Sequence, residues 1–133
     1  MEGMKAPTAT NGPIRSVLKT VMLPAKPDGA AAASTGPARP FNLTAGRVGD
    51  IAFVGFGGEV FNEIGKAVKT ASPFRSTFVF THCNGVAGYV PTRASYAEGG
   101  YEVQTSPFAP GADEQLIEAA LQALRELSEE SDS

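Results

Sequence analysis

The sequence predicts an α/β fold with a βαβ core of parallel strands and a C-terminal packing helix. Residues 51–56 and 77–81 are short apolar runs of strand composition. Between them, residues 59–71 repeat apolar side chains at the spacing of a helix with one buried face. A strand, a helix and a strand within about thirty residues form a βαβ unit, whose strands are parallel. A second apolar stripe, at residues 113–127, predicts the packing helix.

Length and composition limit the class of protein. The chain has 133 residues, which is the size of about one domain. Its net charge is -3, so the sequence lacks the excess of basic residues that is typical of a nucleic-acid-binding protein. A single cysteine, Cys83, excludes an internal disulfide. The sequence has no transmembrane-length apolar run and no signal-like N-terminus, so as written it predicts a cytoplasmic protein.

The N-terminal third is predicted to hold two strands joined by a loop. Residues 1–13 are polar and read as a disordered tail, while residues 14–23 have strand character that ends at Pro24. Residues 25–40 form a low-complexity loop or linker, because their Pro and Gly residues prevent a stable helix. Residues 41–48 are expected to form a short strand that leads into a turn.

The rest of the chain completes a single α/β domain over residues 14–127. The helix at 59–71 ends before Pro73. A polar, Gly-rich loop follows the strand at 77–81, and residues 101–105 are expected to form an edge strand. Residues 128–133 form an acidic tail.

Parallel strands end at the same edge of a sheet, so Glu59 and the loop at residues 82–101 are expected to open toward one crevice. Two readings of Glu59 remain open. It either complements the dipole at the start of a helix or places a functional carboxylate at the end of a strand. Gly57 and Gly58 before it allow a close approach of backbone or substrate.

The His, Cys and Tyr residues of the loop offer further chemistry. His82 and Cys83 are adjacent, so on an extended backbone their side chains diverge, which makes a cysteine-dependent hydrolase the weakest alternative. Tyr89, Tyr96 and Tyr101 either cover a core edge with an anchored hydroxyl, or place a phenol that stabilises an oxyanion or ligates a metal.

Two segments carry a family resemblance. The sequence GGEVFNEIG at residues 57–65 and NGVAGYVPTRASYAEGGYEV at residues 84–103 resemble the C-terminal part of the catalytic domain of neutral/alkaline, non-lysosomal ceramidases. Members of this family are zinc amidohydrolases that cleave the N-acyl amide of ceramide to sphingosine and a fatty acid. The resemblance implies that the chain is a fragment of a larger α/β hydrolase domain with a lipid amide substrate.

The resemblance also implies roles for three residues. Glu59 and Tyr89 would be zinc ligands, and Tyr101 would stabilise the oxyanion of the tetrahedral intermediate. The family's two histidine ligands are absent from this chain, so its zinc site is incomplete and the chain is expected to be inactive alone. A polypeptide that supplies the missing N-terminal half would then be its partner. The alternative function is a non-catalytic interaction module with the same fold, which predicts an exposed apolar face.

Overall fold

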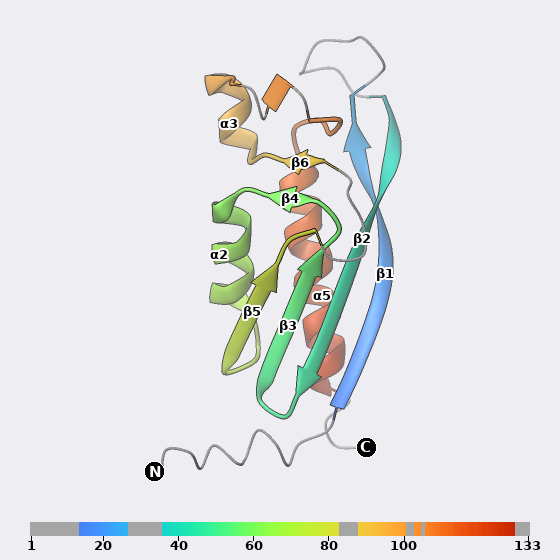
Figure 1. The fold of residues 1–133 in the computed structure, drawn as a ribbon, viewed down its shortest axis with the longest axis vertical. Helices are drawn as coiled ribbons and strands as arrows, with labels where there is room; N and C mark the ends of the chain where they lie inside the picture. Colours follow the sequence, from blue (N-terminus) through green and yellow to red (C-terminus); the bar gives the residue numbers. More distant parts are fainter. Residues whose placement is uncertain (1–13, 27–35, 83–87, 101–102, 105, 130–133) are drawn as a thin grey trace.

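The computed structural model describes residues 14–26, 36–82, 88–100, 103–104 and 106–129. Four strands form one sheet in the order β1-β2-β3-β5 (Figure 1). They are β1 (Ile14–Ala25), β2 (Gly36–Val48), β3 (Ile51–Phe56) and β5 (Ser76–Phe80). The pairs β1–β2 and β2–β3 are antiparallel, whereas β3 and β5 are parallel. The sheet is therefore mixed.

The predicted βαβ unit is present. Helix α2 (Asn62–Ala71) connects the parallel strands β3 and β5. Helix α5 (Ala112–Glu129) contains the predicted C-terminal packing helix and packs against β1 and β2. In Figure 1, α5 runs behind the strands and contacts α2.

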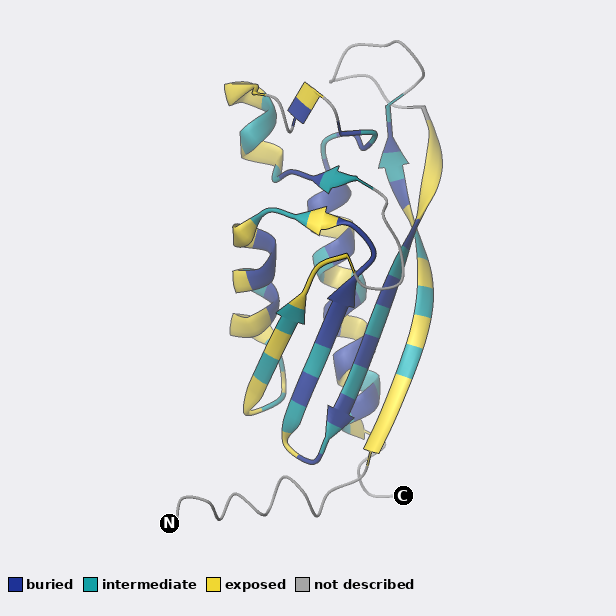
Figure 2. Ribbon diagram, in the orientation of Figure 1, coloured by how far each residue is buried: buried dark blue, intermediate teal, exposed yellow. Residues whose placement is uncertain are grey.

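The core lies between the sheet and these two helices. Alternate residues of β2 from Phe41 onward and of β3 up to Val54 are buried in it, as Figure 2 shows by the alternation of colour along these strands. From α5 the same core receives the predicted apolar stripe, since Leu116, Ala120 and Leu124 are fully buried. The charged residue Arg47 is also buried, and its guanidinium contacts the turn between β2 and β3.

Strand β2 begins at Gly36, so the predicted loop over residues 25–40 is too long at its C-terminal end. Two prolines, Pro37 and Pro40, lie within the strand. They are tolerated because β3 pairs with β2 only from Leu43 onward, which leaves β2 as an edge strand at both prolines. The N-terminal tail and residues 27–35 lie outside the described residues.

The helix expected at 59–71 starts three residues later than predicted, because Glu59 and Val60 form strand β4. Glu59 therefore does not occupy the first turn of α2, and the prediction that it complements a helix dipole is wrong. The acidic residue in that turn is Glu63. Helix α5 ends at Glu129, so it extends two residues into the segment that was predicted to be an acidic tail.

The segment predicted as a loop contains regular structure. Strand β6 (Tyr89–Val90) and helix α3 (Arg93–Glu98) lie within residues 82–101. The edge strand predicted at 101–105 is wrong for Val103 and Gln104, which are helical. Gln104 N donates to Gly100 O at 3.0 Å, a bond that closes a helical turn. Among the described residues, no helix is long and apolar enough to cross a membrane.

Candidate functional site

A short parallel ribbon lies beyond the carboxyl ends of β3 and β5. It consists of β4 (Glu59–Val60) and β6 (Tyr89–Val90), and Figure 1 shows it just past the arrowheads of the two longer strands. In this β4–β6 ribbon Glu59 is the direct partner of Tyr89, and Val60 is the partner of Val90. The two residues assigned to a metal by family resemblance are therefore neighbours, although thirty positions separate them in the sequence.

Two glycines bring the backbone into this ribbon. Gly57 N donates to Asn42 O at 2.8 Å, which holds the chain against β2 after β3 ends. A Cβ at Gly58 would lie 2.6 Å from Gly88 O and 2.9 Å from the ring of Phe41. Only glycine fits such a close approach, and one residue later Glu59 N donates to Gly88 O at 3.0 Å.

The β6 side of the ribbon is held by a buried hydroxyl. Ser106 Oγ donates to Tyr89 O at 2.7 Å and accepts from Phe108 N at 3.1 Å. Ser106 is 2% exposed, so these bonds are shielded from water. The backbone of Tyr89 is thus fixed by Glu59 on one side and by Ser106 on the other.

His82 joins the site next to Glu59. Its Nε2 lies 3.4 Å from Glu59 Oε1, with both side chains about half exposed. His82 has a φ of 56°, in the left-handed region that non-glycine residues seldom adopt. A bond from His82 N to Gly58 O, 3.2 Å long, accompanies this conformation. Such backbone strain is concentrated at functional positions in proteins.

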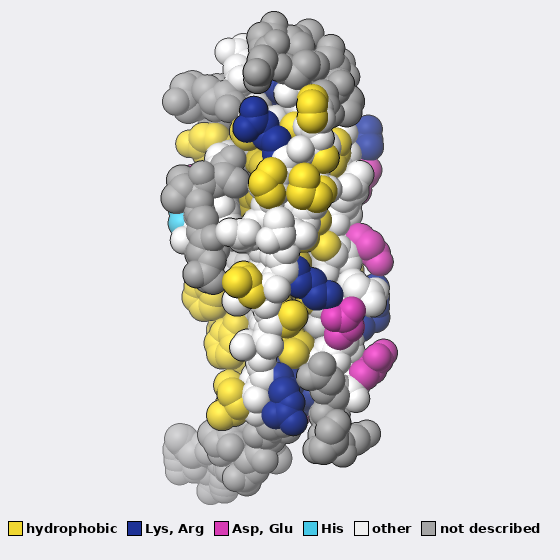
Figure 3. Space-filling view, turned by 90° about the vertical axis from the view of Figure 1, so that its right-hand side faces the viewer, with side chains coloured by type: hydrophobic (Ala, Val, Ile, Leu, Met, Phe, Trp, Pro, Cys, Tyr) yellow, Lys and Arg dark blue, Asp and Glu magenta, His cyan; other side chains and the backbone are white. Residues whose placement is uncertain are grey.

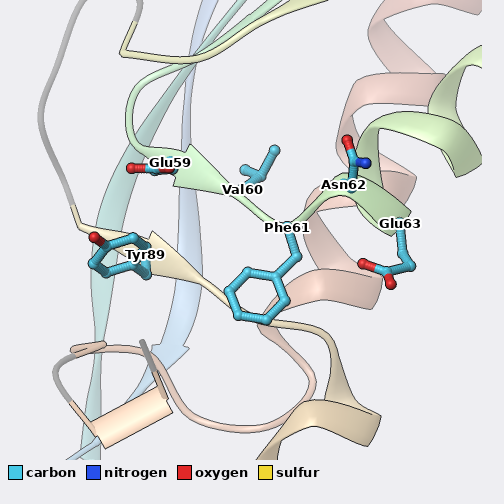
Figure 4. A pocket seen from close by; sticks show the side chains of 6 residues that line it. All are labelled: Glu59, Val60, Phe61, Asn62, Glu63 and Tyr89. Carbon is cyan, nitrogen blue, oxygen red and sulfur yellow. The ribbon is translucent and has the colours of Figure 1, made fainter. Parts of the chain in front are cut away.

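An open pocket of about 490 Å³ borders the ribbon. Figure 4 shows Glu59 and Tyr89 side by side at one end, with the carboxylate and the phenol pointing in the same direction. Phe61 and Val60 supply apolar surface, and Glu63 with Asn62 lies at the other end. The pocket thus combines two carboxylates and a phenol with an apolar wall.

The donors at this site fit zinc in kind but are too few for a complete site. Carboxylate, phenolate and imidazole all supply hard or borderline ligand atoms, and catalytic zinc sites use three protein ligands. Within the described part of the chain, no group of three or more His, Cys, Asp and Glu side chains could hold a metal. The site therefore offers Glu59 and Tyr89, with His82 in contact with Glu59.

The other candidate residues divide into two groups. Tyr96 does not reach the ribbon. Its hydroxyl donates to Phe108 O at 2.7 Å from helix α3, and burial raises the pKa of this phenol. Tyr96 thus anchors a core edge, which was one of the two readings of the loop tyrosines. Tyr101 and Cys83 lie outside the described residues.

The contact of His82 with Glu59 was not predicted. The sequence contained an indication of this contact. His82 comes two residues after β5, and β5 is the parallel neighbour of β3, the strand that precedes Glu59. That geometry placed the loop at residues 82–101 near Glu59 as a whole, and no contact was assigned to His82 itself.

Fold and site together define a mixed α/β domain with oxygen and nitrogen donors at the carboxyl ends of two parallel strands. Two solved structures share this fold. A ceramidase complexed with C2 matches with a TM-score of 0.68 at 17% identity, over 90% of this chain and 31% of that chain. The neutral ceramidase from Pseudomonas aeruginosa matches with a TM-score of 0.68 at 18% identity, over 90% of this chain and 29% of that chain.

The likeness is one of fold. It confirms the predicted resemblance to the neutral ceramidases at that level, and this chain spans less than a third of the length of either structure. No protein-family model and no curated protein matches the sequence.

Proposed function

We propose that this chain carries part of a zinc-dependent amide-hydrolase site of the ceramidase kind, with Glu59 and Tyr89 as metal ligands. One observation supports this most directly. Glu59 and Tyr89 are paired residues of the β4–β6 ribbon and face the same way at the edge of an open pocket. The shared fold with two ceramidase structures adds to it.

In this proposal the residues of the chain have separate tasks. Glu59 and Tyr89 would hold zinc, which when bound supplies a Lewis acid and lowers the pKa of bound water to about 7. His82 would orient the Glu59 carboxylate, as residues that contact a metal-binding side chain often do. Tyr101 keeps its predicted role at the oxyanion. The apolar wall of Phe61 and Val60 would contact the acyl chain of a lipid amide.

The chain alone is proposed to be inactive, as a C-terminal portion of a larger hydrolase. Zinc held by two oxygen ligands is bound weakly, since catalytic sites use three protein ligands. The missing histidine ligands would come from a polypeptide region corresponding to the rest of the ceramidase chain. Ceramide-like lipids would be cleaved to a sphingoid base and a fatty acid only once that region is present.

Zinc titration tests the ligand assignment without requiring turnover. Isothermal titration of the purified chain with zinc should show weak binding at about one site. Glu59→Gln and Tyr89→Phe should each reduce the affinity at least tenfold, because each removes an anionic ligand. Glu63→Gln is the matched control, since Glu63 lines the same pocket on α2 and should leave the affinity unchanged.

The result that contradicts the proposal is equal zinc affinity in the wild type and in Glu59→Gln. His82→Gln separates orientation from ligation. As a positioning residue, His82 should change the affinity by less than Glu59 does.

The second candidate is a non-catalytic interaction module. A specific observation favours it, because large apolar side chains are exposed on the sheet, among them Leu18, Phe78 and Phe80. The two functions separate in the titration above, since an interaction module has no reason to bind zinc through Glu59.

A further inference from the structure

Strand β5 forms one edge of the main sheet, and among the described residues no strand pairs with it on the side away from β3. The unpaired side of an edge strand presents N–H and C=O groups that can pair with another chain. The sequence of β5, STFVF, contains no charge and no proline, and its pairing with β3 runs from Ser76 to Phe80 without a bulge. Strand β5 therefore lacks the features with which proteins normally prevent pairing at an edge.

The opposite edge of the sheet has these features. Strand β1 carries Arg15 and Lys19, contains Pro24, and has an irregular register between Leu23 and Ala25. Figure 3 looks onto this edge and shows Lys and Arg side chains along it. Charges, prolines and bulges all disfavour the addition of a further strand. The comparison indicates that β5, and not β1, is the edge at which another strand can pair.

A pocket of about 220 Å³ lies alongside β5 on the side that faces α2. Figure 1 shows α2 next to β5 at this edge of the sheet. Val79 of β5 and Phe61 supply apolar surface, and helix α2 contributes one of its faces through Gly65, Lys66 and Lys69. Successive side chains of a strand point to opposite faces of a sheet. A strand paired with β5 would therefore direct every second side chain toward this pocket.

On the other face of the sheet, an added strand would lie next to exposed aromatic rings. Phe78 and Phe80 are 50% and 52% exposed. Both rings stack on Phe53 of β3, at 6.0 Å and 6.4 Å between ring centroids. Apolar side chains on neighbouring strands stabilise each other when they lie side by side. The rings therefore favour apolar residues at the positions of an added strand that share their face.

Lys66 and Lys69 make the pocket beside β5 positive. Among the described residues, neither lysine forms an ion pair with an acidic side chain. The acidic residue of α2, Glu63, lines the pocket that borders the β4–β6 ribbon. A carboxylate on the side of an added strand that faces α2 would be attracted by both lysines, and such charge complementarity selects a partner.

We propose that the edge of β5 binds an extended segment of another protein, which joins the sheet as a further strand. This segment carries acidic residues on the side that faces α2 and apolar residues on the side of Phe78 and Phe80. Main-chain hydrogen bonds supply the affinity in such strand addition, and alternate side chains supply the specificity. A second copy of this chain fits less well, because its β5 brings no carboxylate to the lysines. The proposal does not rest on zinc, since Glu59 and Tyr89 take no part in it.

Fluorescence anisotropy with a labelled synthetic peptide tests the charge preference. The peptide has about eight residues, a usual length for a strand, and alternates valine with glutamate. The full chain should bind it at least about tenfold more tightly than a valine–lysine peptide of the same length. Lys66→Glu should weaken binding of the valine–glutamate peptide at least about threefold. Arg125→Glu is the matched control, since it makes the same change of charge on α5, where Arg125 pairs with Glu118, and should leave the affinity unchanged.

A charge reversal tests the position of the peptide. Lys66→Glu combined with Lys69→Glu should bind the valine–lysine peptide more tightly than the valine–glutamate peptide, and that binding also shows that the variant is folded. A preference that the double variant does not reverse overturns the proposal. A wild type that binds neither peptide overturns it as well, and sedimentation equilibrium then shows whether β5 pairs with a second copy.

N-methylated peptides test whether the backbone of the partner pairs with β5. Methyl groups on the valine nitrogens block one edge of the valine–glutamate peptide, and methyl groups on the glutamate nitrogens block the other edge. Strand addition uses one edge, so one of these two peptides should keep its affinity and the other should lose at least about tenfold. Equal affinity of the two methylated peptides would show that only side chains bind, which contradicts the proposal.

Discussion

Of the glycines at the site, Gly58 leaves the least room for a side chain. Because a Cβ there would lie 2.6 Å from the backbone oxygen of Gly88, Gly58→Ala must separate β4 from β6. We expect it to lower the free energy of unfolding by about 1–3 kcal/mol. It should also weaken zinc binding, since Glu59 follows directly. Urea unfolding and zinc titration of the same sample measure both effects.

Gly65→Ala is the control for this prediction. Gly65 lies within helix α2, and a Cβ there would meet Val79 Cγ1 at 3.6 Å, an ordinary contact. Alanine is the better helix former, so the variant should be more stable by about 0.5–1 kcal/mol. If both alanine variants lose the same stability, crowding at Gly58 is not the cause.

The hydroxyl of Tyr96 makes the stability of the fold depend on pH. Burial raises the pKa of its hydroxyl above the ordinary value of 10.0, so the folded state holds this proton more tightly than the unfolded state. The stability that results is present below pH 10 and is lost as pH rises through the folded pKa. Tyr96→Phe should therefore be less stable at neutral pH by about 1 kcal/mol, through loss of the bond to Phe108 O.

Chemical unfolding between pH 8 and pH 11 checks the Tyr96 prediction. The gap between the wild type and Tyr96→Phe should narrow above about pH 10. Lys26, whose pKa burial lowers, acts in the opposite sense over this range but is present in both proteins. A gap that stays constant up to pH 11 would mean that the phenol titrates alike in the folded and unfolded states.

At the scale of elements, Arg47 connects the β2–β3 turn to the end of α5. Its guanidinium donates to Gly49 O from Nε and Nη2 and to Leu127 O from Nη1, at 2.6–3.0 Å. The cation also lies 4.9 Å from the ring centroid of Phe74. Cations stabilise helix C-termini, and a buried guanidinium needs such acceptors.

Arg47→Met should cost about 2–4 kcal/mol of stability, because two carbonyls lose their donor inside the protein. Hydrogen exchange offers a local readout. In the variant, amides in the last turn of α5 and in the β2–β3 turn should exchange faster than in the wild type. Amides of α3, which does not contact Arg47, should exchange at the wild-type rate. Uniform exchange across the chain would show that Arg47 contributes only general stability.

Elements set by local pattern could be predicted from the sequence. The apolar stripes predicted α2 and α5, and the β-branched runs predicted β1, β3 and β5 with small errors at their ends. Strands β4 and β6 have two residues each and exist because their backbones bond to each other across thirty positions. No periodicity in so short a segment indicates such a pairing, so Glu59 was assigned to a helix.

For the whole molecule, the parallel pair β3–β5 carried the prediction of the site. It placed Glu59 and the segment after β5 at one edge, and the structure has Glu59, His82 and Tyr89 there. The metal-ligand roles predicted for Glu59 and Tyr89 came from family resemblance, because residue types alone do not indicate them. The exposure of Leu18, Phe78 and Phe80 depends on the register across four strands, so the sequence alone did not indicate it.

Helix α5 is the last of the described elements to be synthesised, yet it packs against β1 and β2, which are synthesised first. Residues of β1 and β2 bury their inner side chains against it. On the ribosome, the growing sheet therefore emerges with both faces bare until residues 112–129 have left the exit tunnel. Synthesis of this chain creates an interval in which nascent polypeptide can aggregate, and a chaperone that binds apolar segments would act in that interval.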